Sequence, residues 1–100
     1  MTPEGKVKDK VKDLLHEFKP DLSYFMPDGE GVADFVVNAG GTYLEIETKS
    51  VFTKYRMSGR QRYHSWEVLT ANGHYWLIDE TIDLSLLRDT LHSLVYKRRH

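Results

Sequence analysis

The feature that most constrains the fold is a pair of alternating apolar segments separated by two consecutive glycines. The segments Val32 to Asn38 and Thr42 to Lys49 alternate apolar and polar side chains, as strands with one buried face do. Between them, Gly40 and Gly41 permit the positive φ angles that tight hairpin turns need. The sequence therefore predicts an antiparallel hairpin, which needs further strands or helices to cover its apolar face.

Amphipathic helices are predicted on both sides of this hairpin. Thr2 and Pro3 favour the start of a helix, and Pro20 ends the apolar repeat that follows them. A helix is also predicted from Ser58 to about Asn72, with Ser58 as N-cap and Gly73 as its C-terminal stop. We expect its packing face to consist of Tyr63, Trp66 and Leu69. A last helix is indicated by Leu84, Leu87, Leu91, Leu94 and Val95.

Two further strands complete the expected fold. Leu22 to Met26 and His74 to Asp79 both read as short strands. The element order is then helix, three strands, helix, strand, helix. A chain of 100 residues supports one domain. We therefore expect residues 1–100 to form a single α/β domain with a mixed central sheet flanked by helices.

Composition excludes several classes of chemistry. The chain has no cysteine, which rules out disulfides, thiolate zinc sites and cysteine nucleophiles. No apolar run is long enough to span a bilayer, and the first residues lack the hydrophobic region of a signal peptide. We expect a cytoplasmic protein that uses carboxylates, histidines, lysines and hydroxyls.

Charge is segregated along the chain although the net charge is only −1. Between Lys19 and Lys49 there is no lysine or arginine, whereas the acidic residues there are Asp21, Asp28, Glu30, Asp34, Glu45 and Glu47. Basic residues flank this zone, at Lys6, Lys8, Lys10 and Lys12, at Lys54, Arg56, Arg60 and Arg62, and at Lys97 to Arg99. The pattern suits a phosphate-rich ligand held around a cation-binding centre. Ordinary solvated charge is the alternative for any single residue.

The hairpin places two carboxylates together. A turn centred on Gly40 sets Asp34 roughly opposite Glu47, about 5 Å apart at Cβ. Two such carboxylates repel each other unless a hard cation binds between them. Lys49 would lie one pleat farther along the same strand face. A cross-strand ion-pair network on a solvated sheet face is the alternative interpretation.

Other polar residues carry weaker signals. Glu4 falls on the inward stripe of the first helix, where it would need a partner or would simply favour the helix dipole. Glu45 shares a strand face with Glu47, and we expect it to be a solvated rim residue rather than a ligand of a second ion. The histidines lack metal-ligand spacing, so we expect structural or surface roles for them.

Asp34 followed by Glu47-Thr48-Lys49 resembles the D-x(n)-E-x-K signature of the PD-(D/E)XK nuclease superfamily. Within it, the chain is most similar to the VRR-NUC family of virus-type replication and repair nucleases. The similar segments are Thr2 to Lys8, Tyr24 to Pro27, Gly31 to Phe35 and Leu44 to Lys49, together with Gln61. Ala33 stands where the family usually has proline. The resemblance covers residues 2 to about 80 and implies a restriction-endonuclease-like core of order αβββαβ, followed by a C-terminal helix.

The resemblance also implies a metal site that holds Mg²⁺ or Mn²⁺ and no organic cofactor. In it, Asp34 and Glu47 would bind the ion, and Glu4 would complete or support the site. The Ile46 carbonyl would join as a backbone ligand. Lys49 would orient or activate the attacking water, and Gln61 would hold the site or the substrate phosphate.

The function implied is that of a metal-dependent DNA endonuclease of phage or mobile-element type, acting on branched or four-way-junction DNA as a homodimer. In a phage-encoded enzyme this would take place in the host cytoplasm. Candidate phosphate contacts are Lys6, Lys10, Lys54, Arg56, Arg60 and Arg62. Two alternatives remain open. One is a non-catalytic module that binds nucleic acid or protein on the same fold, and the other is a restriction-type endonuclease with a short recognition sequence.

Overall fold

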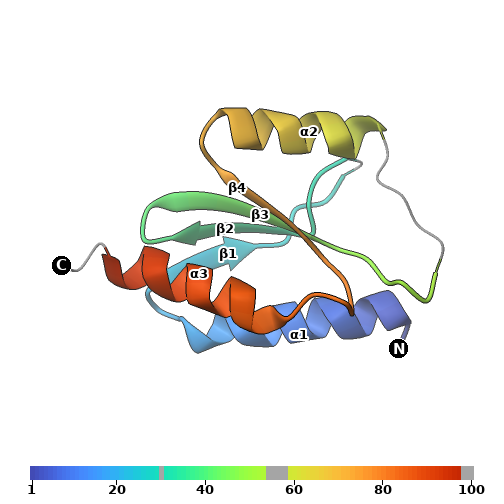
Figure 1. Cartoon of the computed structure of the whole chain (residues 1–100), viewed down its shortest axis with the longest axis horizontal. Helices are drawn as coiled ribbons and strands as arrows, with labels where there is room; N and C mark the ends of the chain where they lie inside the picture. The colour runs from blue at the N-terminus through green and yellow to red at the C-terminus, as the bar shows by residue number, and fades with distance from the viewer. Residues whose placement is uncertain (30, 54–58, 98–100) are drawn as a thin grey trace.

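The computed structural model describes residues 1–29, 31–53 and 59–97, and its elements follow the predicted order (Figure 1). The helices are α1 (Pro3–Glu17), α2 (Gly59–Thr70) and α3 (Leu84–Lys97). The strands are β1 (Leu22–Phe25), β2 (Phe35–Ala39), β3 (Thr42–Thr48) and β4 (His74–Ile78). At the start of α1, the Thr2 hydroxyl accepts a hydrogen bond from the Gly5 N–H at 3.0 Å, which confirms the predicted cap. Among the described helices, none is long and apolar enough to cross a membrane.

The four strands form one mixed sheet in the order β1-β2-β3-β4. The first two pairings are antiparallel, whereas β3 and β4 are parallel. A parallel pair needs a crossover connection, and α2 lies in this one. Figure 1 shows α2 on one side of the sheet and α1 and α3 on the other. The predicted α/β class with a mixed sheet flanked by helices is therefore confirmed.

The hairpin forms with the predicted register. Gly40 and Gly41 both have positive φ angles, 61° and 89°, and Phe35 pairs with Ile46. Strand β2 begins at Phe35, three residues later than predicted, because the Thr48 N–H that could continue the ladder bonds to the Asp34 side chain instead. Asp34 therefore stands one residue before β2, next to the end of β3.

The apolar core lies on the α1 and α3 side of the sheet. Helix α1 contributes Val7, Val11, Leu14 and Leu15, and α3 contributes Leu87, Leu91 and Val95. The sheet contributes Leu22, Phe35, Val37, Ala39, Leu44, Ile46 and Ile78. In β3 the side chains alternate, so that Leu44 and Ile46 enter this core and Tyr43, Glu45 and Glu47 point toward α2. The two faces of β3 therefore have opposite chemistry.

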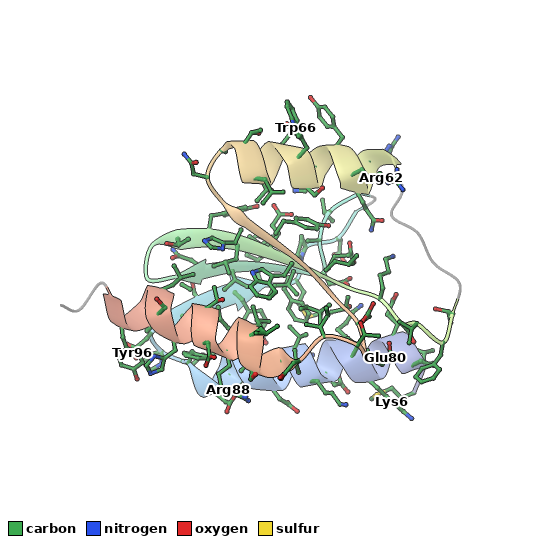
Figure 2. All side chains as sticks on the ribbon, in the orientation of Figure 1. Lys6, Arg62, Trp66, Glu80, Arg88 and Tyr96 are labelled. Atoms are coloured by element: carbon green, nitrogen blue, oxygen red, sulfur yellow. The ribbon has the colours of Figure 1, made fainter. Side chains whose placement is uncertain are left out.

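The expected packing face of α2 is wrong. Tyr63, Trp66 and Leu69 are 62%, 58% and 56% exposed, and Figure 2 shows Trp66 on the side of α2 away from the sheet. Helix α2 instead turns Gln61, His64 and Val68 toward the sheet. The reason is that the strand face beneath it carries carboxylates, which need hydrogen-bond donors rather than apolar partners.

The C-terminal stop of α2 also differs from the prediction. Asn72, rather than Gly73, adopts the left-handed conformation, with φ of 64°. The Asn72 N–H donates to the Leu69 carbonyl at 3.1 Å, and the Gly73 N–H donates to the Val68 carbonyl at 2.9 Å. These bonds satisfy carbonyls of the last turn and direct the chain into β4. The predicted N-cap, Ser58, lies outside the described residues.

Gly40 should not tolerate a side chain. A Cβ there would overlap the Leu94 carbonyl oxygen of α3, and the positive φ disfavours any L-residue. We expect Gly40→Ala to reduce the free energy of unfolding by about 2 kcal/mol or more, measured by urea denaturation. The matched control is Gly59→Ala, because a Cβ at Gly59 meets no described atom within 4 Å. Equal stability of the two variants would contradict the proposed role of the turn.

Candidate functional site

The residues predicted to carry chemistry converge on one open cavity of about 860 Å³. It lies at the end of the polar sheet face, where β3, the loop before β2, α1 and the first turn of α2 meet. Its lining comprises Glu4, Gly29, Gly31, Val32, Asp34, Glu47, Lys49, Gly59, Arg60 and Gln61. The five side chains predicted for catalysis, Glu4, Asp34, Glu47, Lys49 and Gln61, are therefore brought together.

Asp34 is held at the cavity wall by Thr48 and faced by a lysine. Its Oδ2 accepts hydrogen bonds from the Thr48 N–H at 2.8 Å and the Thr48 hydroxyl at 2.6 Å. Its Oδ1 lies 3.4 Å from Nζ of Lys8. Burial raises the pKa of Asp34, but hydrogen bonds to Glu47 and Thr48 and the Lys8 charge outweigh it, so the pKa is lowered overall. Asp34 is therefore the ionised member of this site.

Glu47 is the protonated member. It is 3% exposed, shares a hydrogen bond with Asp34, and accepts another from Nε2 of Gln61 at 2.7 Å. Burial, followed by the hydrogen bond and the charge of Asp34, raises the pKa of Glu47 to about 8 against the effects of Lys49 and Gln61. At neutral pH one proton is thus shared between two carboxyl groups.

This proton occupies a position that suits a divalent cation. Two carboxylates in hydrogen-bond contact repel each other when both are ionised, and a hard cation with oxygen ligands removes that repulsion. The donor set of Asp34 and Glu47 therefore fits Mg²⁺ or Mn²⁺. Among residues 1–29, 31–53 and 59–97, no three His, Asp or Glu side chains form a metal-binding group. Glu4 lines the cavity but does not complete such a group.

The remaining predicted ligands occupy different positions. Lys49 lies two residues beyond Glu47, and its charge lowers the pKa of Glu47. Its own backbone N–H donates to the Ile78 carbonyl at 2.9 Å, which fixes the strand end. Ile46 lies in the central strand β3, between Phe35 and Trp76, with its side chain in the core. Coordination through the Ile46 carbonyl remains a prediction.

The basic residues predicted to bind nucleic acid are dispersed. Lys6 and Lys10 line a separate pocket on the α1 side, and Arg60 lines the cavity of the carboxylates. Figure 2 shows Lys6 and Arg62 on opposite sides of the sheet. Lys54 and Arg56 lie outside the described residues. The described members of this set thus do not form one continuous basic surface.

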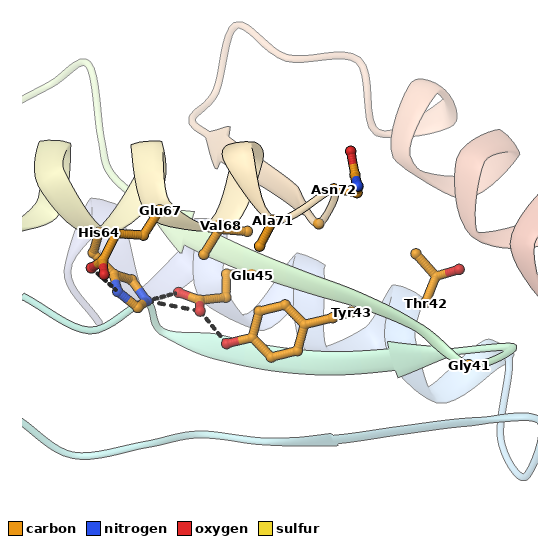
Figure 3. Close-up of a pocket in the computed structure, with 10 residues that line it drawn as sticks. Gly41, Thr42, Tyr43, Glu45, His64, Glu67, Val68, Ala71 and Asn72 are labelled. Atoms are coloured by element: carbon orange, nitrogen blue, oxygen red, sulfur yellow. Dashed lines mark hydrogen bonds and ion pairs between the residues drawn. The ribbon is translucent and has the colours of Figure 1, made fainter.

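A second polar cluster, not anticipated from the sequence, joins β3 to α2 (Figure 3). Glu45 is 1% exposed, so the expectation that it is a solvated rim residue is wrong. It accepts a hydrogen bond from the Tyr43 hydroxyl, and its two carboxylate oxygens lie 2.7 and 2.8 Å from Nε2 of His64. Burial, followed by the hydrogen bond and charge of Glu45, raises the pKa of Tyr43 to about 12. Nδ1 of His64 lies 3.8 Å from Glu67.

This cluster positions Gln61. His64 follows Gln61 by one helical turn, so its attachment to Glu45 fixes the part of α2 that carries Gln61 to Glu47. The structural role expected for the histidines is thus found at His64. The signals in the sequence were the alternation of Tyr43, Glu45 and Glu47 on one strand face and the spacing of Gln61 and His64. Neither reveals burial, which depends on where α2 packs.

Tyr75 of β4 is a further member of the polar face. It pairs with Glu45 in the parallel register between β3 and β4. Burial, followed by the charges of Glu47, Glu45 and Asp34, raises the pKa of its hydroxyl. Tyr75 therefore stays neutral beside the carboxylates.

Comparison of the chain with protein-family models, with curated proteins and with solved structures gave no match in any of the three. The geometry above therefore carries the functional argument.

The raised pKa of Glu47 predicts how stability depends on pH. An unfolded Glu47 loses its proton near pH 4.5, whereas the folded one keeps it up to about pH 8. In this window the folded state binds more protons, so the stability contributed by Glu47 falls as the pH rises. We expect metal-free Glu47→Gln to exceed the wild type in unfolding free energy by about 1 to 2 kcal/mol above pH 8, and to match it near pH 4.5.

Urea denaturation across this range measures the effect. Asp34 does not obscure it, because a lowered pKa costs stability only as the pH falls below its usual value of 3.8. Asp13→Asn, which changes an exposed carboxylate of α1, is the control and should keep the wild-type slope. If the unfolding free energy of Glu47→Gln changed with pH as steeply as that of the wild type, Glu47 would not be protonated in the folded protein.

Proposed function

We propose that this protein is a divalent-metal-dependent DNA endonuclease similar to the VRR-NUC nucleases of the PD-(D/E)XK superfamily. The observation that carries the proposal is the proton-sharing pair Asp34 and Glu47, with Lys49 and Gln61 in the same cavity. Such a set suits hydrolysis of a phosphodiester, in which negative charge develops at the phosphate. The mixed sheet and the order of the elements support the proposal that this chain has the restriction-endonuclease-like core of that superfamily.

Each residue has a proposed role. Asp34 and Glu47 would hold Mg²⁺ or Mn²⁺, assisted by Glu4 and by the Ile46 carbonyl. A bound ion would supply positive charge at the phosphate and would acidify a water molecule. The Lys49 ammonium would orient that water or stabilise the charge on the phosphate. Gln61 donates to Glu47 and so keeps its carboxyl group oriented toward Asp34.

The proposed substrate is branched DNA. Arg60 lies in the cavity lining and Arg62 is exposed on the same helix, so both would place positive charge near a phosphate bound at the carboxylates. Lys6 and Lys10 would require DNA that reaches the α1 side as well, which a branched substrate can do better than a straight duplex. Phosphate contacts of this kind position DNA without reading its sequence. Action in the cytoplasm, of a phage host in particular, is part of the same proposal.

One observation favours a second candidate, a binding module without turnover. No buried side-chain nitrogen or oxygen among the described residues lacks a hydrogen-bond partner. The carboxylate site is thus internally satisfied without a metal ion, as a purely structural cluster would be. This candidate predicts metal-independent DNA or protein binding. A restriction-type enzyme would differ from both by giving discrete fragments of linear duplex.

The decisive assay is cleavage of labelled linear, single-stranded, flapped and four-way-junction DNA with Mg²⁺, Mn²⁺ or EDTA. We expect cleavage of branched DNA that needs the metal and falls at least about 100-fold in Asp34→Ala and Lys49→Ala. Asp13→Asn is the matched control, because it removes an exposed carboxylate away from the cavity. Retention of DNA binding by folded protein that cleaves no substrate would favour the binding module.

We also propose that the protein is a homodimer in which the outer face of α2 is buried between two copies. Tyr63 and Trp66 lie with their ring centroids 5.9 Å apart on this face, and exposed Leu69 extends it along the helix. Exposed aromatic side chains grouped in this way are typical of interaction sites. A twofold pair would present two cavities to two DNA strands, which suits a branched substrate.

Sedimentation velocity measures this association. We expect the wild type to sediment as a dimer and Trp66→Glu to sediment as a monomer, because a charge in the apolar contact opposes burial. Leu86→Glu, which changes an exposed apolar residue of α3, is the control and should remain dimeric. A wild-type monomer, or a dimer in Trp66→Glu, would rule out this interface.

A further inference from the structure

A lysine of α1 to which the sequence assigned no role at the site contacts Asp34 of the carboxylate pair. Nζ of Lys8 lies 3.4 Å from Oδ1 of Asp34. The other oxygen of Asp34 is already engaged by the two hydrogen bonds from Thr48. Oδ1 is therefore the oxygen that an incoming cation can reach without breaking the strand end. In this structure the Lys8 ammonium faces it.

Lys8 is well placed to leave this position. Its side chain is 31% exposed, so the ammonium can move into water at small cost. Glu4 precedes it by one helical turn on α1 and lines the same cavity. A glutamate four residues before a lysine is the favourable order for an ion pair on a helix. Glu4 thus offers the ammonium a second anionic partner inside the cavity.

We propose that Lys8 is a tethered counter-ion that competes with the divalent cation for Asp34, and that binding of the cation transfers its ammonium toward Glu4 and the substrate phosphate. The second half of this inference, the transfer of the ammonium toward a substrate phosphate, rests on the proposed nuclease function. The first half, the competition for Asp34, does not. This first half concerns the metal-free protein, in which the Lys8 ammonium lies 3.4 Å from the Asp34 carboxylate. Lys8 is a positioning residue in this scheme, and Glu4 supports the metal site by receiving its ammonium.

Two effects of opposite sign follow. Removing the Lys8 charge takes away the ammonium that faces Oδ1 of Asp34 and its repulsion of the incoming cation, so the metal should bind more tightly. The same change removes a positive charge that lies 3.4 Å from Asp34, at the edge of the cavity in which a phosphate would bind, so turnover should fall. If Lys8 only stabilised the fold, its removal would lower metal affinity and turnover together. If Lys8 were a solvated surface lysine, its removal would change neither quantity.

The test compares Lys8→Met, Lys8→Arg and the control Lys12→Met, which removes the same charge from the same helix one turn beyond the lysine that contacts Asp34. The first readout is calorimetric titration of the metal-free proteins with MnCl₂. We expect Lys8→Met to bind Mn²⁺ about fivefold more tightly than the wild type, as for loss of a partly exposed ion pair. Lys8→Arg and Lys12→Met should stay within about twofold.

The second readout is cleavage of four-way-junction DNA at saturating Mn²⁺. We expect turnover of Lys8→Met to fall about tenfold or more although its metal site is full, and Lys8→Arg to retain most of the rate. Circular dichroism and thermal unfolding confirm that each variant is folded. Opposite changes in metal affinity and turnover would support both halves of the proposal.

The remaining outcomes separate the proposals. Unchanged or weaker Mn²⁺ binding by Lys8→Met, with a wild type that binds Mn²⁺ and cleaves DNA, overturns the role of Lys8 and leaves the nuclease intact. Tighter binding by Lys8→Met without cleavage by any variant, the wild type included, overturns the nuclease and the phosphate role but supports the competition. If neither protein binds Mn²⁺, the metal centre and the role of Lys8 both fail.

Discussion

The register of the β2–β3 hairpin is the constraint on which the rest of the structure depends. Two glycines with positive φ set the turn, and the pairing of Phe35 with Ile46 follows from it. Because side chains alternate along a strand, a shift of one residue would move Glu47 into the apolar core and Ile46 into the cavity. The Thr48 hydrogen bonds to Asp34 then close the hairpin at its open end. One turn and one threonine thus determine where the carboxylates meet.

The chemistry of the sheet face determines how α2 packs. A carboxylate that is nearly inaccessible to water needs donors, and α2 supplies Gln61 to Glu47 and His64 to Glu45. These contacts turn its polar side inward and leave Tyr63 and Trp66 exposed. The molecule therefore has one conventional apolar core, between the sheet and α1 with α3, and one polar layer beneath α2. Buried ionisable groups gathered in this way are more typical of functional sites than of stabilising cores.

Two lysines supply positive charge to this layer. Lys49 lines the cavity just beyond the end of β3, two residues after Glu47, and Lys8 of α1 contacts Asp34. Burial is the largest effect on the pKa of both carboxyl groups, but at Asp34 the hydrogen bonds and the lysine together outweigh it, whereas at Glu47 the hydrogen bond and charge of Asp34 add to it. Their pKa values move apart, and one proton remains between them. This asymmetry leaves the pair with one anionic and one neutral member, which avoids the repulsion between two ionised carboxylates.

The sequence by itself determined the elements, the hairpin and the proximity of Asp34 to Glu47, because each depends on patterns within a few residues of the chain. A family resemblance also singled out Glu4, Lys49 and Gln61, which line the same cavity as Asp34 and Glu47. Tertiary structure alone decided the inward face of α2, the burial of Glu45 and the contact of Lys8 with Asp34. Periodicity shows which side chains of a helix share a face, but what covers that face decides which one is buried. Here strand carboxylates that required hydrogen-bond donors outweighed the apolar preference of Tyr63, Trp66 and Leu69.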